Sequence, residues 1–231
     1  MDAVGLSMLV CLALSTCHFS VSPLHKKLHL HRKPVASFSG GAAAGYVFLH
    51  LFPELEASHT GTGSGIHAVV LFGFVLLYSI DTKLRSKTGL ADDGAHGYRV
   101  LRIGFATVYS FLIAYTMSEN LPLTPLTALA FTLALGLHTL SLDMKLIDEF
   151  GHATHRSSRL ILTVALLSGW LLSYLTEIPE VLVDSATAMM AGFIVFTVFS
   201  EELQDQKNIR IFWFAFGAFV YFMLEVISRY W

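Results

Sequence analysis

The chain has 231 residues, of which 54% are hydrophobic and 14% charged, and its formal net charge is −2. A mean hydropathy of +0.61 excludes a soluble globular domain and indicates a membrane protein with several spans. The basic residues are dispersed among short loops, which argues against nucleic-acid binding, and two cysteines, Cys11 and Cys17, are too few for a disulfide framework or zinc cluster.

Eight apolar stretches approach the length of a bilayer-spanning helix, about 20 residues. They cover residues 2–22, 36–57, 66–82, 99–118, 124–146, 159–176, 182–201 and 209–230. The first ends in small residues like a secretory signal, but Met1-Asp2 lacks the positive charge that opens such signals, so we expect the helix to be retained. The short loops leave no room for a soluble catalytic domain, and the spans contain neither His-Glu-x-x-His nor Gly-x-Ser-x-Gly. We therefore expect an all-α polytopic membrane protein that is not an enzyme.

The basic residues predict the orientation of these spans. All fifteen Lys and Arg residues except Arg229 fall in or beside loops 1–2, 3–4, 5–6 and 7–8, whereas loops 2–3, 4–5 and 6–7 carry none. Because basic residues collect on the cytoplasmic side of short loops, both termini are expected on the non-cytoplasmic side of the cell membrane.

Two segments 147 positions apart share a pattern. AGYVFLHLFPELE (residues 44–56) and AGFIVFTVFSEEL (residues 191–203) match at Ala-Gly-aromatic and again at Phe52 and Glu54 against Phe199 and Glu201. One interpretation is helix-packing chemistry alone, since small residues let helices approach closely. The other is an inverted repeat, because the second and seventh spans cross the membrane in opposite directions. The repeat interpretation predicts a 3+2+3 plan in which one membrane domain, 1–231, comprises repeat A (1–84), central helices (99–146) and repeat B (159–231).

The second span, SGGAAAGYVFLHLFPELEASH with its His50-x-x-Pro53-Glu54 ending, and the seventh, MMAGFIVFTVFSEELQ, resemble the Zrt/Irt-like (ZIP) zinc and iron transporters. The resemblance implies eight spans in this inverted plan and transport of a divalent metal cation without ATP or a soluble cofactor. The chain departs from the family where two central motifs normally hold the metal. The fourth span has Tyr109, Ser110 and Ile113 at the ligand positions, and the fifth keeps His138 but has Thr139 and Leu142, with Asp143 one place later. The usual binuclear site is therefore absent.

Polar residues inside apolar spans usually face a bundle interior or a wet cavity, because burying a charge in lipid is costly. The candidate metal ligands are His50, Glu54, His138, Asp143, Glu201 and Glu202, and with Glu56 and Ser141 they would form a ladder across the membrane. Imidazole and carboxylate ligands suit zinc, iron or manganese.

Each candidate also has a structural interpretation. His50 is then a packing histidine, and Asp143, Glu201 and Glu202 are solvated helix ends. Glu119 and Glu225 read as structural, and Asp184 as a helix-start acid facing the positive end of the helix dipole. The basic loop His25–Lys33 is expected to face anionic headgroups, and DEFGHATH (residues 148–155) is a weak metal-capture segment.

The expected function is transport of zinc, iron or manganese by a ZIP-like carrier. The alternative is a non-transporting ZIP-like scaffold or partner protein in the membrane. The expected partners are the divalent cation and the lipid bilayer, without nucleic acid, and a homodimer is left open. No resident cofactor is expected, since the metal ion is the cargo.

Overall fold

The computed structural model describes residues 3–27, 32–57, 64–85, 91–120, 125–176, 179–204 and 210–230. All regular structure in these ranges is helical. The elements are α1 (Ala3–Lys27), α2 (Arg32–Tyr46), η1 (Val47–Leu51), α3 (Phe52–Ala57), α4 (Ser64–Arg85), α5 (Ala91–Asn120), α6 (Pro125–Leu175), α7 (Glu180–Gln204) and α8 (Ile211–Tyr230). The predicted all-α class is therefore confirmed for the described residues.

Seven stretches within these helices are long and apolar enough to cross a membrane. They are Val4–His25, Lys33–Ala57, Gly65–Lys83, Arg99–Met117, Ala128–Asp148, Arg156–Leu175 and Glu180–Ser200. The apolar stretch of α8, Ile211–Ile227, is shorter. The described chain thus supports seven spans by length and composition, and the multi-pass membrane class follows from them.

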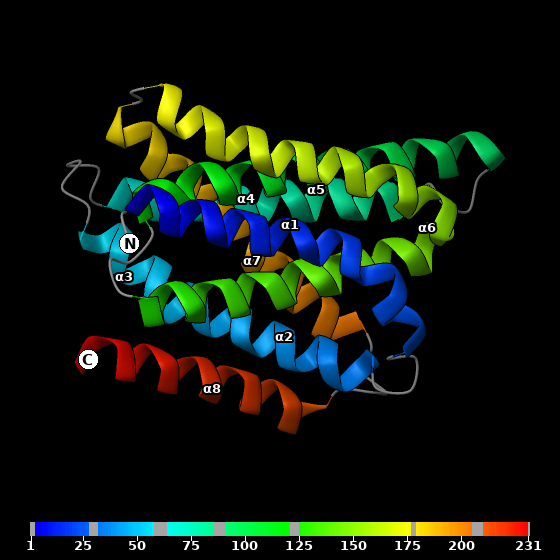
Figure 1. Cartoon of the computed structure of the whole chain (residues 1–231). Helices are drawn as coiled ribbons and strands as arrows, with labels where there is room; N and C mark the ends of the chain where they lie inside the picture. Colours follow the sequence, from blue (N-terminus) through cyan, green and yellow to red (C-terminus); the bar gives the residue numbers. More distant parts are fainter. Residues whose placement is uncertain are drawn as a thin grey trace.

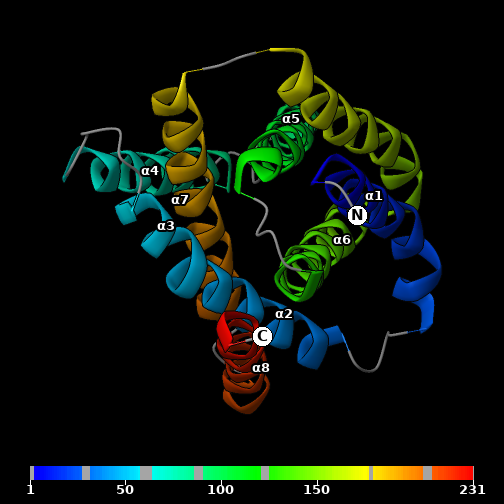
Figure 2. The same cartoon turned by 60° about the vertical axis from the view of Figure 1, so that its left-hand side comes forward.

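Successive spans alternate in direction through the bundle, and both termini lie at the same end (Figure 1). We call this the terminal end. The opposite end, where α1 ends and α2 begins, is called the basic end because Lys27, Lys83, Arg99 and Arg156 lie there. The most extensive helix contacts are α2 with α8, α4 with α7, and α6 with both α1 and α5. Figure 2 shows α4 and α7 together on one side and α2 and α8 together at the lower edge.

The fifth and sixth predicted spans are the two helical arms of α6, which run in opposite directions and meet at a sharp bend (Figure 1). The bend lies at Gly151, whose φ of 82° and ψ of 167° are not helical. A positive φ costs glycine little because it has no Cβ, which explains why the bend falls on this residue. The sequence places a separate loop between residues 146 and 159, but the helix instead continues on both sides of the bend.

A π-helical turn, η1, interrupts the second span immediately before Pro53. Its last bond runs from the Phe52 amide to the Val47 carbonyl, five residues back instead of four. Proline has no amide hydrogen and its ring crowds the carbonyl four residues earlier, so the helix widens at this point. The wide turn carries His50.

Two glycines 147 positions apart occupy matching contacts. A Cβ at Gly45 would lie 3.0 Å from Cβ of Tyr221 on α8, and a Cβ at Gly192 would overlap the Val70 carbonyl on α4 and lie 2.8 Å from the Phe74 amide nitrogen. Tyr221 and Phe74 are themselves 147 positions apart. Both glycines therefore allow the close helix approach that small residues provide in membrane bundles.

The aromatic residue after each of these glycines, Tyr46 after Gly45 and Phe193 after Gly192, also makes a matching ring contact. Tyr46 meets Phe131 of α6 edge-on at 5.3 Å, and Phe193 meets Phe105 of α5 edge-on at 5.0 Å. Tyr46 and Phe193 are again 147 positions apart, and their partners lie on the two helices at the centre of the sequence. These rings belong to or pack against one buried apolar core, which also contains Leu51, Ile113, Leu135 and Ile194.

Candidate functional site

His50 lies between two carboxylates on different helices. Its Nε2 is 3.8 Å from Oε2 of Glu54, one turn further along its own span, and its Nδ1 is 3.7 Å from Oε1 of Glu225 on α8. The ring stacks on Tyr46, with centroids 5.5 Å apart. The π-helical turn and the α2–α8 contact together bring these groups to one place near the terminal end.

A third carboxylate belongs to this cluster. Asp184 of α7 and Glu225 both interact electrostatically with Glu54. Oε2 of Glu54 and Oδ2 of Asp184 are buried and have no hydrogen-bond partner among the described residues. Two carboxylates beside the imidazole, and a third that interacts with Glu54, make the local potential negative, which favours a cation there. We call His50, Glu54, Asp184 and Glu225 the acidic cluster.

One residue of the acidic cluster corrects an expectation from sequence. Glu225, for which the sequence predicts a structural role, is only 6% exposed and faces His50, which is compatible with that role. Asp184 was expected to open its helix, but α7 begins at Glu180, so Asp184 lies beyond the first turn. Both acids lie in apolar stretches of the sequence, and this alone could have marked them as candidates for a buried site. The sequence does not show which helix each of them faces.

His138 lies deeper in the bundle, in the first arm of α6, and is 1% exposed. Its Nε2 is 3.2 Å from Oγ1 of Thr197 on α7, and that oxygen also lies 3.0 Å and 2.9 Å from two carbonyls of its own helix. The hydroxyl has one proton and three acceptors within reach, Nε2 and the two carbonyls, so the direction of the bond between Nε2 and Oγ1 depends on the histidine tautomer. The ring of Tyr109 approaches edge-on, with centroids 6.1 Å apart.

The three residues of the fourth span that the ZIP resemblance places at ligand positions are buried in the bundle. Tyr109, Ser110 and Ile113 of α5 are all at most 4% exposed. They offer a phenol, a hydroxyl and an alkyl group, none of them a preferred ligand of zinc, iron or manganese.

Asp143 forms a buried pair with a residue that the sequence analysis missed. Nδ1 of His18 on α1 donates to Oδ2 of Asp143 at 2.6 Å, and the two residues are 1% and 2% exposed. Asp143 is therefore not the solvated helix end of the alternative interpretation. The sequence does offer one indication of this pair: His18 is a lone histidine in the apolar first span, and a buried polar group needs a hydrogen-bond partner.

A second pair joins the same two helices closer to the basic end. Nε2 of His25 donates to Oδ1 of Asp148 at 2.8 Å. This contact engages the acid of the proposed metal-capture segment, whereas the side chains of His152 and His155 lie outside the described part of the structure. The side chains of Glu201 and Glu202 lie outside it as well, although their backbone belongs to α7.

The acidic cluster and His138 lie at different depths. His138 follows Phe131 by seven residues, about 10 Å along α6 at 1.5 Å per residue, and Asp143 lies about 7.5 Å further. His50 lies one turn beyond Tyr46 in the opposite direction, because the second span and the first arm of α6 run antiparallel (Figure 1). The layer between contains the packed side chains of Tyr46, Phe131 and Leu135. The candidate ligands predicted from sequence therefore do not form one continuous path: the acidic cluster and His138 are separated by packed apolar side chains.

Within the described side chains, no three His, Cys, Asp or Glu residues converge as a metal site. No protein-family model and no curated protein matches the chain.

Proposed function

We propose that the chain is a carrier for a divalent metal cation, of the kind that the ZIP resemblance implies. The observation that carries the proposal is His50 on a π-helical turn between Glu54 and Glu225, 3.8 and 3.7 Å from them. π-Turns occur often at functional sites, and ionisable groups buried in membrane spans are costly to keep without a use. The acidic cluster would capture the cation.

An inverted 3+2+3 arrangement of eight spans is part of this proposal, with α8 as the eighth. Repeat A would hold α1, α2 with η1 and α3, and α4, and repeat B the second arm of α6, α7 and α8. The matched contacts of Gly45 with Gly192 and of Tyr46 with Phe193 support it. Inverted repeats around a central site are the usual frame for alternating access.

His138 is the proposed inner station of the path. The buried imidazole of His138, whose Nε2 is hydrogen-bonded to Thr197, places a nitrogen-bearing side chain on the far side of the apolar layer. A cation needs weak sites in series so that it can leave as well as bind. Opening of the layer between Tyr46 and Leu135 would connect the two stations. No bond is made or broken in the cargo, so the proposed protein is not an enzyme.

The proposed orientation places the basic end in the cytoplasm of a cell whose plasma membrane holds the protein. Basic residues favour the cytoplasmic side, and both termini then lie outside together with the acidic cluster. The cation would enter at the acidic cluster and move inward down its gradient.

Transport into vesicles tests the proposal. The full chain is reconstituted in liposomes that contain a metal-sensitive dye, and zinc, iron(II) or manganese(II) is added outside. We expect uptake of at least one ion and a loss of about tenfold or more in Glu54→Gln and Glu225→Gln, since each removes one charged ligand. Glu180→Gln is the matched control, because Glu180 is an exposed carboxylate at the start of α7, outside the acidic cluster and the ladder. Uptake equal to that of empty liposomes for all three ions would refute the proposal.

A non-transporting membrane scaffold is the second candidate. The observation that favours it is the lack of three converging ligands among the described side chains. It predicts that His138→Ala and Glu54→Ala leave the cellular phenotype intact, whereas a bulky residue at Gly45 or Gly192 abolishes it through the helix contacts.

A further inference from the structure

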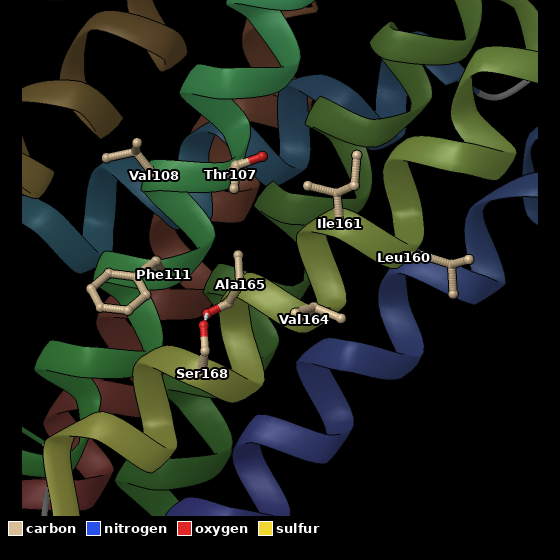
Figure 3. Close-up of a pocket in the computed structure, with 8 residues that line it drawn as sticks. All are labelled: Thr107, Val108, Phe111, Leu160, Ile161, Val164, Ala165 and Ser168. Carbon is tan, nitrogen blue, oxygen red and sulfur yellow. Dashed lines mark hydrogen bonds between the residues drawn. The ribbon is translucent and has the colours of Figure 1, made fainter. Parts of the chain in front are cut away.

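A groove of about 550 Å³ lies on the outer surface of the bundle, between α5 and the second arm of α6 (Figure 3). Its α5 wall is formed by Thr107, Val108 and Phe111, and its α6 wall chiefly by Ile161, Val164 and Ala165. These residues belong to Arg99–Met117 and Arg156–Leu175, two of the stretches suited to cross the membrane. The groove is therefore a hollow within the lipid-facing surface, separate from the acidic cluster and His138.

The wall of the groove is apolar even where its residues carry hydroxyls. Thr107 Oγ1 donates to the Ile103 carbonyl at 2.7 Å, and Ser168 Oγ donates to the Ala165 carbonyl at 2.9 Å. Both hydroxyls are thus engaged by their own helices. Val164 at the mouth is 65% exposed. A hydrocarbon chain fits such a wall, because it loses no hydrogen bond on entering.

The groove is narrow at one end and open at the other. At Gly169 the two helices touch, since a Cβ there would overlap the carbonyl group of Phe111. At Gly104, two turns earlier on α5, no atom lies within 4 Å of the place that a Cβ would occupy. The helices run parallel, so the open end points to the basic end of the bundle (Figure 1).

Two arginines lie beyond the open end at similar depth. The contact of Phe111 with Gly169 fixes a register of 58 residues between the helices, which places Arg99 level with residue 157, next to Arg156. That level is about 12 Å from Thr107 at 1.5 Å per residue. Arg156 is exposed, and Arg99 contacts His96 at 2.9 Å. Basic residues at such a position between spans hold anionic headgroups.

We propose that this groove binds one anionic phospholipid, with an acyl chain against Val164 and Phe111 and the phosphate near Arg99 and Arg156. The apolar wall would pack against the acyl chain, and the positive charge beyond the open end would attract the anionic headgroup. The site does not depend on transport by the protein.

Lipid retention tests the site. The full chain is reconstituted in vesicles of equal phosphatidylglycerol and phosphatidylcholine, extracted in mild detergent, and analysed by native mass spectrometry. We expect one phosphatidylglycerol retained per chain in preference to phosphatidylcholine. In Val164→Trp the indole fills the mouth and the retained lipid is lost. Leu171→Trp is the matched control, because Leu171 is 50% exposed on the same helix but lies outside the groove, and it should keep the lipid.

The headgroup contact has its own variant, which leaves the groove intact. In the double variant Arg99→Gln and Arg156→Gln, the preference for phosphatidylglycerol should fall about thirtyfold, equivalent to about 2 kcal/mol. Arg210→Gln, an exposed arginine at the start of α8, should leave the preference unchanged. Equal retention of both lipids by the unmodified chain, full retention by Val164→Trp, or a lipid-free dimer in the spectrum would each overturn the proposal.

Discussion

The His18–Asp143 pair should contribute far more to stability than the His25–Asp148 pair, although both join α1 to α6 through a short contact. Removing one partner of a buried charged pair costs about 3–5 kcal/mol, because the other is left without compensation in a low-dielectric site. An exposed pair contributes about 0.2–1 kcal/mol. His18 and Asp143 are 1% and 2% exposed, whereas the His25 and Asp148 side chains are 12% and 40% exposed. We expect Asp143→Ala to lower the free energy of unfolding by about 3–5 kcal/mol and Asp148→Ala by less than about 1 kcal/mol.

The assay is unfolding in mixed micelles, in which a denaturing detergent is titrated into the purified chain and helicity is followed by circular dichroism. Adding His18→Ala to Asp143→Ala completes a double-mutant cycle. The double variant should lose less than the sum of the single losses, with a coupling energy of about 0.5–3 kcal/mol. Equal losses in Asp143→Ala and Asp148→Ala, or no measurable coupling, would show that burial does not set the energy of this pair.

Three further changes have defined outcomes. Gly192→Leu should destabilise the chain by about 1–3 kcal/mol or more in the same titration, because its side chain would overlap the α4 backbone, whereas Gly65→Leu, in open space, should stay close to the parent. Thr197→Val removes the oxygen that is hydrogen-bonded to Nε2 of His138 and should cost about 1–3 kcal/mol in that titration, since a buried polar group loses its partner. Pro53→Ala should allow an ordinary α-turn, move the His50 imidazole away from Glu225 and lower vesicle uptake, while circular dichroism shows an unchanged helical signal.

Apolar length and small-residue spacing carried most of the information about the helices. Gly45 contacts Tyr221, and Gly192 contacts the α4 backbone. The two glycines are offset by the same number of residues as the two matching sequence segments. The position of the bend also follows locally, because glycine is the residue that adopts a positive φ at little cost. The eighth stretch was less predictable, since its described apolar part, Ile211–Ile227, falls short of a full span.

The candidate site was harder to predict because its partners are far apart in the chain. His50 and Glu54 lie four positions apart on one span, so their proximity could be expected from helix geometry. The approach of Glu225 to His50, and of His18 to Asp143, depends on which faces of distant helices meet. Periodicity identifies the buried face of a helix but not the helix opposite to it. The separation of His138 from the acidic cluster likewise follows from how Tyr46 and Phe131 pack.

The bend at Gly151 joins the helical arms that contribute to two different proposed sites. One arm of α6 carries His138 at the centre of the bundle, and the other carries Val164 at the periphery. Gly151 is the residue between them whose torsion angles are not helical, so its φ and ψ set the angle between the two arms. A substitution that changed these torsion angles would therefore alter the packing around His138 and the shape of the outer groove together.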